Sequence, residues 1–179
     1  MTKIKLTGYG GQGIILAGEI LAFAAMLDGK ESSAIGEYGS AARGGLTTSQ
    51  VIIDDQFISA PFVEEIDILI ALSQEGYNKY FKQLKSTGFV LYDSSMIVPN
   101  GFSQQYAVPA VDMALKELRS TVVGNMIMLG ALSSITKIVS KQSLLNAIKE
   151  NVSPKFTEIN IQGLEIGYHK VQEIFKLQK

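Results

Sequence analysis

The chain has 179 residues, which is enough for one domain with a buried core, and we expect residues 1–179 to form a single domain. Its 16 basic and 17 acidic residues nearly balance and are spread along the chain, so the composition argues against a nucleic-acid partner. The absence of cysteine excludes disulfides, a thiolate nucleophile and any iron–sulfur cluster held by thiolates of this chain.

Hydrophobic residues make up 46% of the chain, which is rich for a free-standing soluble monomer and indicates that some apolar surface meets a partner. No apolar run reaches the roughly 18 residues that a membrane span needs, and no signal-peptide pattern opens the sequence. We therefore expect a cytoplasmic protein without a membrane partner.

The first element in chain order is a strand over residues 4–7, followed by a glycine-rich turn and a helix over residues 13–27. The turn, residues 8–13, has the sequence Gly-Tyr-Gly-Gly-Gln-Gly. Glycines between a strand and a helix let the backbone approach a ligand or a second chain closely, while the first free N–H groups of the helix face the gap. This arrangement suits a phosphate.

The same turn allows a second interpretation, the dinucleotide-binding motif of a free-standing nicotinamide- or flavin-dependent oxidoreductase. That motif also needs an acidic residue about 20 positions further on. Glu31 lies 18 residues after Gly13, but it belongs to a polar turn over residues 28–33, where a solvated carboxylate is the simpler interpretation. The glycine turn is thus the sole support for this alternative.

Two further strands are expected over residues 31–35 and 47–53, and the loop between them carries a second unusual motif. Residues 36–45 contain four glycines, Tyr38 and Arg43 around small side chains. Arg43 offers a planar fork that binds a carboxylate or a phosphate, whereas a tight turn with Arg43 paired to a neighbouring carboxylate explains the same residues structurally. If this loop faces the glycine turn, the two form one anion-accepting cleft.

Continuous apolar runs over residues 67–72 and 88–93 are typical of buried parallel strands, and the helical segment 75–84 between them completes a strand–helix–strand unit. A further strand is expected over residues 105–108. The pattern is then helical over residues 111–117, 125–138, 142–150 and 160–177. The fold class is therefore α/β, with a mainly parallel central sheet flanked by helices and a helical C-terminal third.

The sequence contains no convincing catalytic or metal-binding set. The only histidine, His169, is expected on a partly exposed helix, and a metal site there lacks the other ligands that it needs. A Ser-His-Asp triad is disfavoured because there is no Gly-x-Ser-x-Gly elbow and nothing local pairs His169 with a serine. We assign no catalytic residue and no metal ligand to this chain.

Four motifs occur in one order along the chain: Gly-x-Gly-Gly-Gln-Gly at residues 8–13, Tyr-Gly-x-x-x-Arg-Gly-Gly at 38–45, Val-Pro-Ala at 108–110, and Asn-Met-x-x-Leu-Gly-Ala at 125–131. In this order and spacing, over nearly the whole chain, they resemble the gamma subunit of 2-oxoacid:ferredoxin (acceptor) oxidoreductases. The resemblance is strongest to the 2-oxoglutarate enzyme, followed by the pyruvate and 2-oxoisovalerate enzymes.

The resemblance implies a Rossmann-like domain within a multisubunit enzyme. Such an enzyme decarboxylates a 2-oxoacid oxidatively to an acyl-CoA and CO₂, with coenzyme A as co-substrate and ferredoxin as electron acceptor. Its thiamine diphosphate, Mg²⁺ and iron–sulfur clusters belong to partner subunits, namely thiamine diphosphate-binding alpha and beta chains and a ferredoxin-like delta chain. The gamma-type chain alone is expected to hold no cofactor and to be inactive.

The resemblance also assigns two groups of site residues. They are Gly8, Gly10, Gly11, Gln12 and Gly13 in the first turn, and Tyr38, Gly39, Arg43, Gly44 and Gly45 in the second loop. We expect them at a cleft that faces either coenzyme A or a partner subunit, where Arg43 meets a phosphate or a carboxylate and Gln12 hydrogen-bonds across the cleft. An assembly module without any catalytic complex is the remaining alternative.

Overall fold

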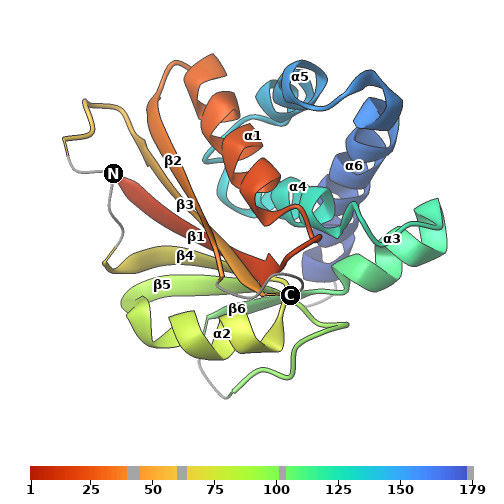
Figure 1. The fold of residues 1–179 in the computed structure, drawn as a ribbon, viewed down its shortest axis with the longest axis horizontal. Helices are drawn as coiled ribbons and strands as arrows, with labels where there is room; N and C mark the ends of the chain where they lie inside the picture. The colour runs from red at the N-terminus through yellow and green to blue at the C-terminus, as the bar shows by residue number, and fades with distance from the viewer. Residues whose placement is uncertain (40–44, 60–63, 101–103, 177–179) are drawn as a thin grey trace.

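The computed structural model describes residues 1–39, 45–59, 64–100 and 104–176. The centre of the described fold is a six-stranded sheet with the strand order β2-β3-β1-β4-β5-β6 (Figure 1). The strands are β1 (Thr2–Tyr9), β2 (Glu31–Tyr38), β3 (Leu46–Asp54), β4 (Ile66–Ala71), β5 (Leu84–Asp93) and β6 (Gln105–Val108).

Five of the six strands run in one direction and β3 runs against them. β1 pairs in parallel with β4, β4 with β5, and β5 with β6, whereas β3 is antiparallel to both β1 and β2. The ends of the five aligned strands therefore lie at one edge of the sheet, together with the start of β3. We call this the carboxyl edge, and the expectation of a mainly parallel sheet is confirmed.

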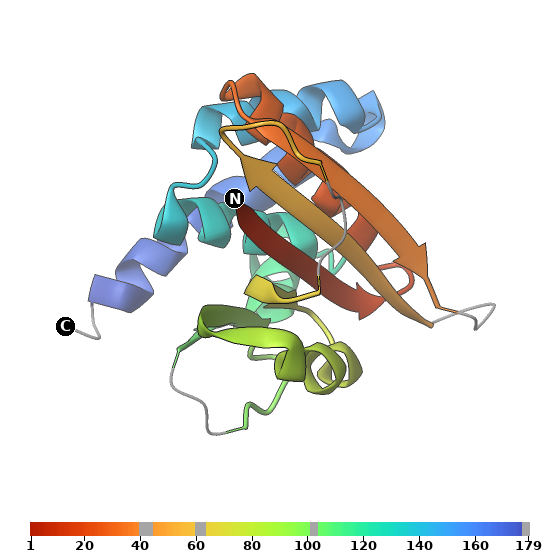
Figure 2. The same ribbon diagram turned by 90° about the vertical axis from the view of Figure 1, so that its left-hand side faces the viewer.

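Two unequal helical layers cover the sheet (Figures 1 and 2). The larger layer contains α1 (Ile14–Leu27), α4 (Gly124–Thr136), α5 (Lys141–Asn151) and α6 (Pro154–Lys176), with α3 (Ala110–Leu118) beside α4 and α6, and the smaller layer contains α2 (Gln74–Tyr80). Within β4, Ile68 and Ile70 join the larger core, while Leu69 and Ala71 join the smaller core with Tyr77 of α2. Burial on both faces explains the continuous apolar run of this strand.

The chain leaves the neighbouring strands β1 and β4 in opposite directions along the sheet. β1 leads through α1 to β2 on one side, and β4 leads through α2 to β5 on the other side and on the opposite face. Ligand sites of open α/β sheets lie outside the strand ends at such a point. The topology therefore directs attention to the carboxyl edge near β1 and β4.

Helices α4 and α6 cross with their backbones in close contact. A Cβ at Gly130 of α4 would overlap the carbonyl oxygen of Leu164, and a Cβ at Gly167 of α6 would overlap that of Ile127. Only glycine permits this approach, because a backbone carbonyl in a regular helix cannot move aside as a side chain can. The crossing fixes the position of α4, which reaches the carboxyl edge with its first residues.

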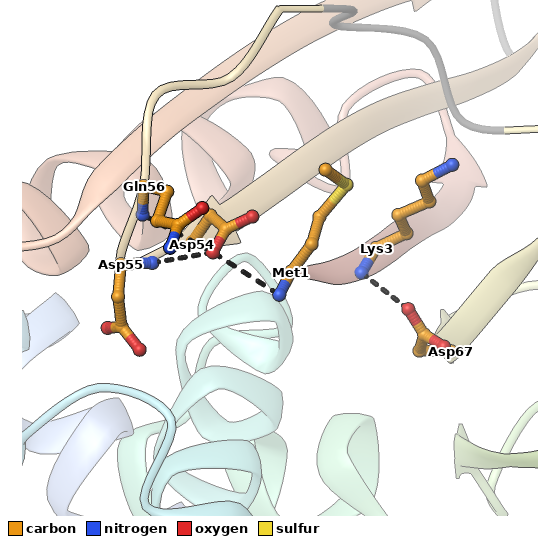
Figure 3. A network of polar contacts seen from close by, with 6 residues as sticks. All are labelled: Met1, Lys3, Asp54, Asp55, Gln56 and Asp67. Atoms are coloured by element: carbon orange, nitrogen blue, oxygen red, sulfur yellow. Dashed lines mark hydrogen bonds and ion pairs between the residues drawn. The ribbon is translucent and has the colours of Figure 1, made fainter.

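At the opposite, amino edge of the sheet, two aspartates bind the start of β1 (Figure 3). The N-terminal ammonium group of Met1 lies 3.3 Å from Oδ1 of Asp54 at the end of β3. The backbone N–H of Lys3 donates to Oδ2 of Asp67 in β4 at 2.8 Å. The start of β1 is thus tied to both of its neighbouring strands.

The strands and helices expected from the sequence are confirmed, with shifts at some ends. The last helix begins at Pro154 rather than near residue 160, because the fixed φ and missing N–H of proline suit the first position of a helix. The helix expected over residues 75–84 ends at Tyr80 and continues as a 3₁₀ turn, Phe81–Gln83, since β5 already begins at Leu84.

We expect Gly167→Ala to destabilise the protein by about 3 kcal/mol, because the added methyl group overlaps a backbone carbonyl. The matched control is Gly124→Ala in α4, where a Cβ would lie 3.6 Å from Cγ2 of Val111, an ordinary contact. The better helix propensity of alanine should make the control neutral or stabilising by up to about 1 kcal/mol. Urea unfolding followed by circular dichroism measures both, and equal stabilities would contradict the close crossing.

Candidate functional site

The glycine turn, residues 8–13, joins β1 to α1 at the carboxyl edge. Gly11 and Gly13 have φ angles of 96° and 67°, in the left-handed region that other residues disfavour. Gly13 is the N-cap of α1, and no side chain caps the helix there. The backbone N–H groups of residues 14–16 therefore have no hydrogen-bond partner in the described part of the chain.

The second glycine motif lies beside the first, because β3 starts next to the end of β1. The register pairs Gly8 with Thr47, and just beyond it the N–H of Gly10 donates to the carbonyl of Gly45 at 3.0 Å. The β2–β3 pair places Tyr38 opposite Thr47 on its other side. The fold thus brings together the described parts of two motifs whose relative placement the sequence left open.

Most of the predicted site residues lie at this edge. They are Gly8, Gly10, Gly11, Gln12, Gly13, Tyr38, Gly39 and Gly45, whereas Arg43 and Gly44 lie outside the described residues. Gly39 allows a close approach of the hairpin strands, since a Cβ there would lie 2.5 Å from the carbonyl oxygen of Leu46. The contacts of these residues with a ligand or a partner stay predictions.

The side chain of Gln12 holds the glycine turn through two hydrogen bonds to backbone groups. Its Oε1 accepts a hydrogen bond from the N–H of Tyr9 at 2.6 Å, and its Nε2 donates to the carbonyl of Leu72 at 3.2 Å. Leu72 directly follows β4, so the side chain bridges the ends of β1 and β4. The side-chain amide of Gln12 keeps a second N–H and a second lone pair, so its expected hydrogen bond across the cleft stays a prediction.

Asn125 connects the turn to α4. Its Nδ2 donates to the carbonyl of Gly13 at 3.0 Å, and its Oδ1 accepts from the N–H of Met126 at 2.8 Å. The residue is 3% exposed, and a Cβ on Gly13 would overlap its amide group. The motif at residues 125–131 therefore begins with the residue that positions the start of α1.

Asp93 is buried at the end of β5 and holds the start of α3. Its carboxylate accepts hydrogen bonds from the backbone N–H groups of Ser95 at 2.9 Å and Val111 at 3.0 Å. Because the N-cap of α3, Pro109, makes no side-chain cap, Asp93 acts as a remote cap for this helix. Burial raises the pKa of Asp93 above its usual value, and the hydrogen bonds oppose that rise.

A cavity of about 400 Å³ opens between the two motifs. It is lined by the glycine turn, the first two turns of α1, and Tyr38 and Thr47 of the hairpin. Glu19 is the only charged side chain among the described residues that line it. No motif marks Glu19 in the sequence, although it is the single charged residue in an otherwise apolar helix, and that contrast is the signal that could have found it.

A second hollow, of about 330 Å³, lies on the α4 and α6 side of the same turn. It shares Gly13 and Leu16 with the cavity and extends to Val122, before α4, and Phe156 of α6. Val122 and Phe156 are 63% and 51% exposed. Apolar surface therefore continues across the start of α1 at the carboxyl edge.

Glu31 lies at the far end of β2 from the glycine turn. It begins β2 opposite Asp54, whereas Tyr38 at the end of the same strand lies opposite Thr47 beside the turn. A strand of this length separates the two positions by about 23 Å. Glu31 therefore cannot contact a ribose bound at the turn, and the dinucleotide interpretation loses its acidic partner.

The lone histidine belongs to a helix surface. His169 is exposed on α6, with its Nε2 3.1 Å from the ammonium group of Lys141 on α5. Among the described residues, no group of three or more His, Asp or Glu side chains is placed to hold a metal ion. No described helix is both long enough and apolar enough to cross a membrane.

The raised pKa of Asp93 predicts a pH dependence of stability. The protonated carboxyl group contributes fully to the free energy of unfolding below its pKa in the unfolded chain, 3.8. This contribution is lost as the pH rises through the pKa of the folded state. The free energy of unfolding of the wild type, relative to Asp93→Asn, should therefore fall as the pH rises above 3.8. Urea unfolding over a pH series tests this, with Asp112→Asn on exposed α3 surface as the charge control. A difference that does not change with pH would contradict it.

Asn125→Asp should lower the free energy of unfolding by about 2 to 3 kcal/mol, because a carboxylate oxygen at this buried position then faces the carbonyl oxygen of Gly13. Asn146→Asp, on the exposed side of α5, is the matched control and should change stability by about 0.5 kcal/mol or less. Urea unfolding gives both values. If the two variants are equally stable, Asn125 does not hold the turn.

Comparisons with known proteins agree with this architecture. The family model described as "Pyruvate ferredoxin/flavodoxin oxidoreductase" matches residues 3–170. The chain is 41% identical over 177 residues to the 2-oxoglutarate synthase subunit KorC of Methanocaldococcus jannaschii, covering 96% of this chain and 95% of that one. It is 32% identical over 177 residues to the pyruvate synthase subunit PorC of Methanothermobacter thermautotrophicus, covering 97% and 98%.

A solved structure shares the whole fold. The keto/oxoacid ferredoxin oxidoreductase gamma subunit from Geobacter sulfurreducens is 36% identical, with a TM-score of 0.84, and the match covers 97% of this chain and 99% of that one. Sequence and structure thus agree from the first strand to the last helix. The chain belongs to the pyruvate ferredoxin/flavodoxin oxidoreductase family, as a gamma-type subunit.

Proposed function

We propose that the chain works in a complex that oxidatively decarboxylates a 2-oxoacid, with 2-oxoglutarate as the best-supported substrate. In this reaction CO₂ leaves the 2-oxoacid, the acyl group passes to coenzyme A, and two electrons pass to ferredoxin. The observation that carries the proposal is the 41% identity to a 2-oxoglutarate synthase subunit over nearly the full length of both chains. The 32% identity to a pyruvate synthase subunit supports pyruvate less strongly.

Other subunits would supply the reacting centre. The chain contains no cysteine, so thiolate-held iron–sulfur clusters would need another chain. In this proposal, alpha and beta subunits hold thiamine diphosphate with its Mg²⁺, a ferredoxin-like delta subunit carries electrons, and the assembled complex is cytoplasmic. The gamma-type chain is inactive by itself because none of these groups belongs to it.

The contribution of this chain would lie at the carboxyl edge. Main-chain groups of the two glycine motifs and the exposed side chains of Val122 and Phe156 make a surface suited to being covered by another subunit. The free N–H groups of residues 14–16 could also receive a phosphate of coenzyme A. Because the Glu19 carboxylate lines the same cavity and repels such an anion, assembly is the role that this geometry favours.

Affinity purification of the tagged chain from its native host tests the proposal. We expect the purification to recover thiamine diphosphate-bearing subunits. The recovered complex should reduce a dye in the presence of coenzyme A, faster with 2-oxoglutarate than with pyruvate or 2-oxoisovalerate. The purified chain alone is the control and should reduce no dye. A chain that purifies alone and binds NAD or NADP in calorimetry would support the dinucleotide alternative, and partners without thiamine diphosphate would support an assembly module.

A further inference from the structure

Glu19 is the one charged residue among the described residues that line the cavity between the two glycine motifs. Glu19 lies on the second turn of α1 with its side chain exposed, and it makes no hydrogen bond or ion pair with any described residue. It is also the only charged residue of α1. Helix α1 thus carries its single negative charge near the carboxyl edge.

Tyr38 also lines this cavity. It ends β2 and is 81% exposed, although large aromatic side chains usually bury most of their area. Within the described part of the chain, its hydroxyl has no hydrogen-bond partner and its ring contacts no other ring or cation. Two residues that line the cavity, Glu19 and Tyr38, therefore have no side-chain partner among the described residues.

We propose that this cavity receives an arginine side chain of the adjoining subunit in the assembled oxidoreductase. A planar guanidinium group pairs with Glu19 through two N–H groups and stacks on the ring of Tyr38. The apolar side chains of Ile15 and Leu16, which also line the cavity, contact the methylene stem of the arginine. A lysine ammonium has neither the planar fork nor the stacking face, so arginine fits this set better.

The charges around the cavity favour a cation over an anion. The start of α1 carries about half a unit of positive charge, which fades within the first turn. Glu19 carries a full negative charge and lies about 8 Å further along the helix than Ile14. A phosphate in this cavity would be repelled by the carboxylate of Glu19. A guanidinium group beside Glu19 and Tyr38 would lie too far from the start of α1 to be repelled by its positive charge.

The proposal rests on the proposed role of this chain in a multisubunit complex. In the separate chain the two groups are exposed, and water screens any charge that they meet. When another subunit covers the cavity, water is excluded, and the contact of the carboxylate with a guanidinium group becomes stronger. Loss of either group should therefore weaken association while leaving the stability of the separate chain unchanged.

The test compares three substitutions in the tagged chain, each mixed with the subunits that copurify with the wild type. Glu19→Gln removes the charge, and Tyr38→Leu removes the ring but keeps apolar bulk. Glu31→Gln is the matched control, because it removes an exposed carboxylate at the opposite end of β2. Biolayer interferometry at low and high salt gives the dissociation constants, and thermal unfolding confirms that each variant is folded.

We expect a dissociation constant about tenfold higher for Glu19→Gln and for Tyr38→Leu. In Glu19→Gln the dissociation constant should also depend less on salt. The dissociation constant of Glu31→Gln should stay within about twofold of the wild-type value. Unchanged association of Glu19→Gln would overturn the proposal. Tighter binding of coenzyme A to the Glu19→Gln complex, without weaker association, would also overturn it and assign the cavity to an anion. If the wild-type chain recovers no subunit, the proposed function fails together with the arginine proposal. If subunits are recovered and Glu19→Gln associates normally, only the arginine proposal fails.

Discussion

The antiparallel pairing of β3 with β1 determines where the second glycine motif lies. Because β3 reverses the direction of the chain, the loop after β2 returns at the carboxyl edge, next to the end of β1. A parallel β3 would need a crossover connection and would start at the amino edge instead. The hydrogen bond from Gly10 to Gly45 then joins the two motifs, and the cavity forms between them.

The turn between β1 and α1 is held from several sides at once. Gln12 ties it to the ends of β1 and β4, Asn125 ties it to α4, and the positive φ angles of Gly11 and Gly13 allow the sharp change of direction. These bonds use main-chain groups of the strand ends and the turn, whereas the N–H groups of residues 14–16 have no hydrogen-bond partner among the described residues. The glycine turn at the carboxyl edge is therefore positioned by bonds within the chain before any partner binds.

Local sequence patterns were sufficient for the elements but not for their pairing. The apolar runs of β4 and β5 predict buried strands, and the glycine spacing at residues 8–13 predicts the turn. An alternating strand such as β3 is compatible with either direction, so its antiparallel placement does not follow from the pattern. The bonds of Gln12 to Leu72 and of Asn125 to Gly13 join positions 60 and 112 residues apart, and no local pattern encodes such a distance.

The two hollows that flank the start of α1 differ in chemistry, and this difference matters for docking. The hollow beside Val122 and Phe156 is mainly apolar, and apolar contact supplies affinity with little directional preference. The cavity with Glu19 and Tyr38 offers one charge and one ring, which fix orientation and partner choice more than affinity. In the proposed complex, docking in a single register uses both surfaces, because an apolar surface alone would permit sliding.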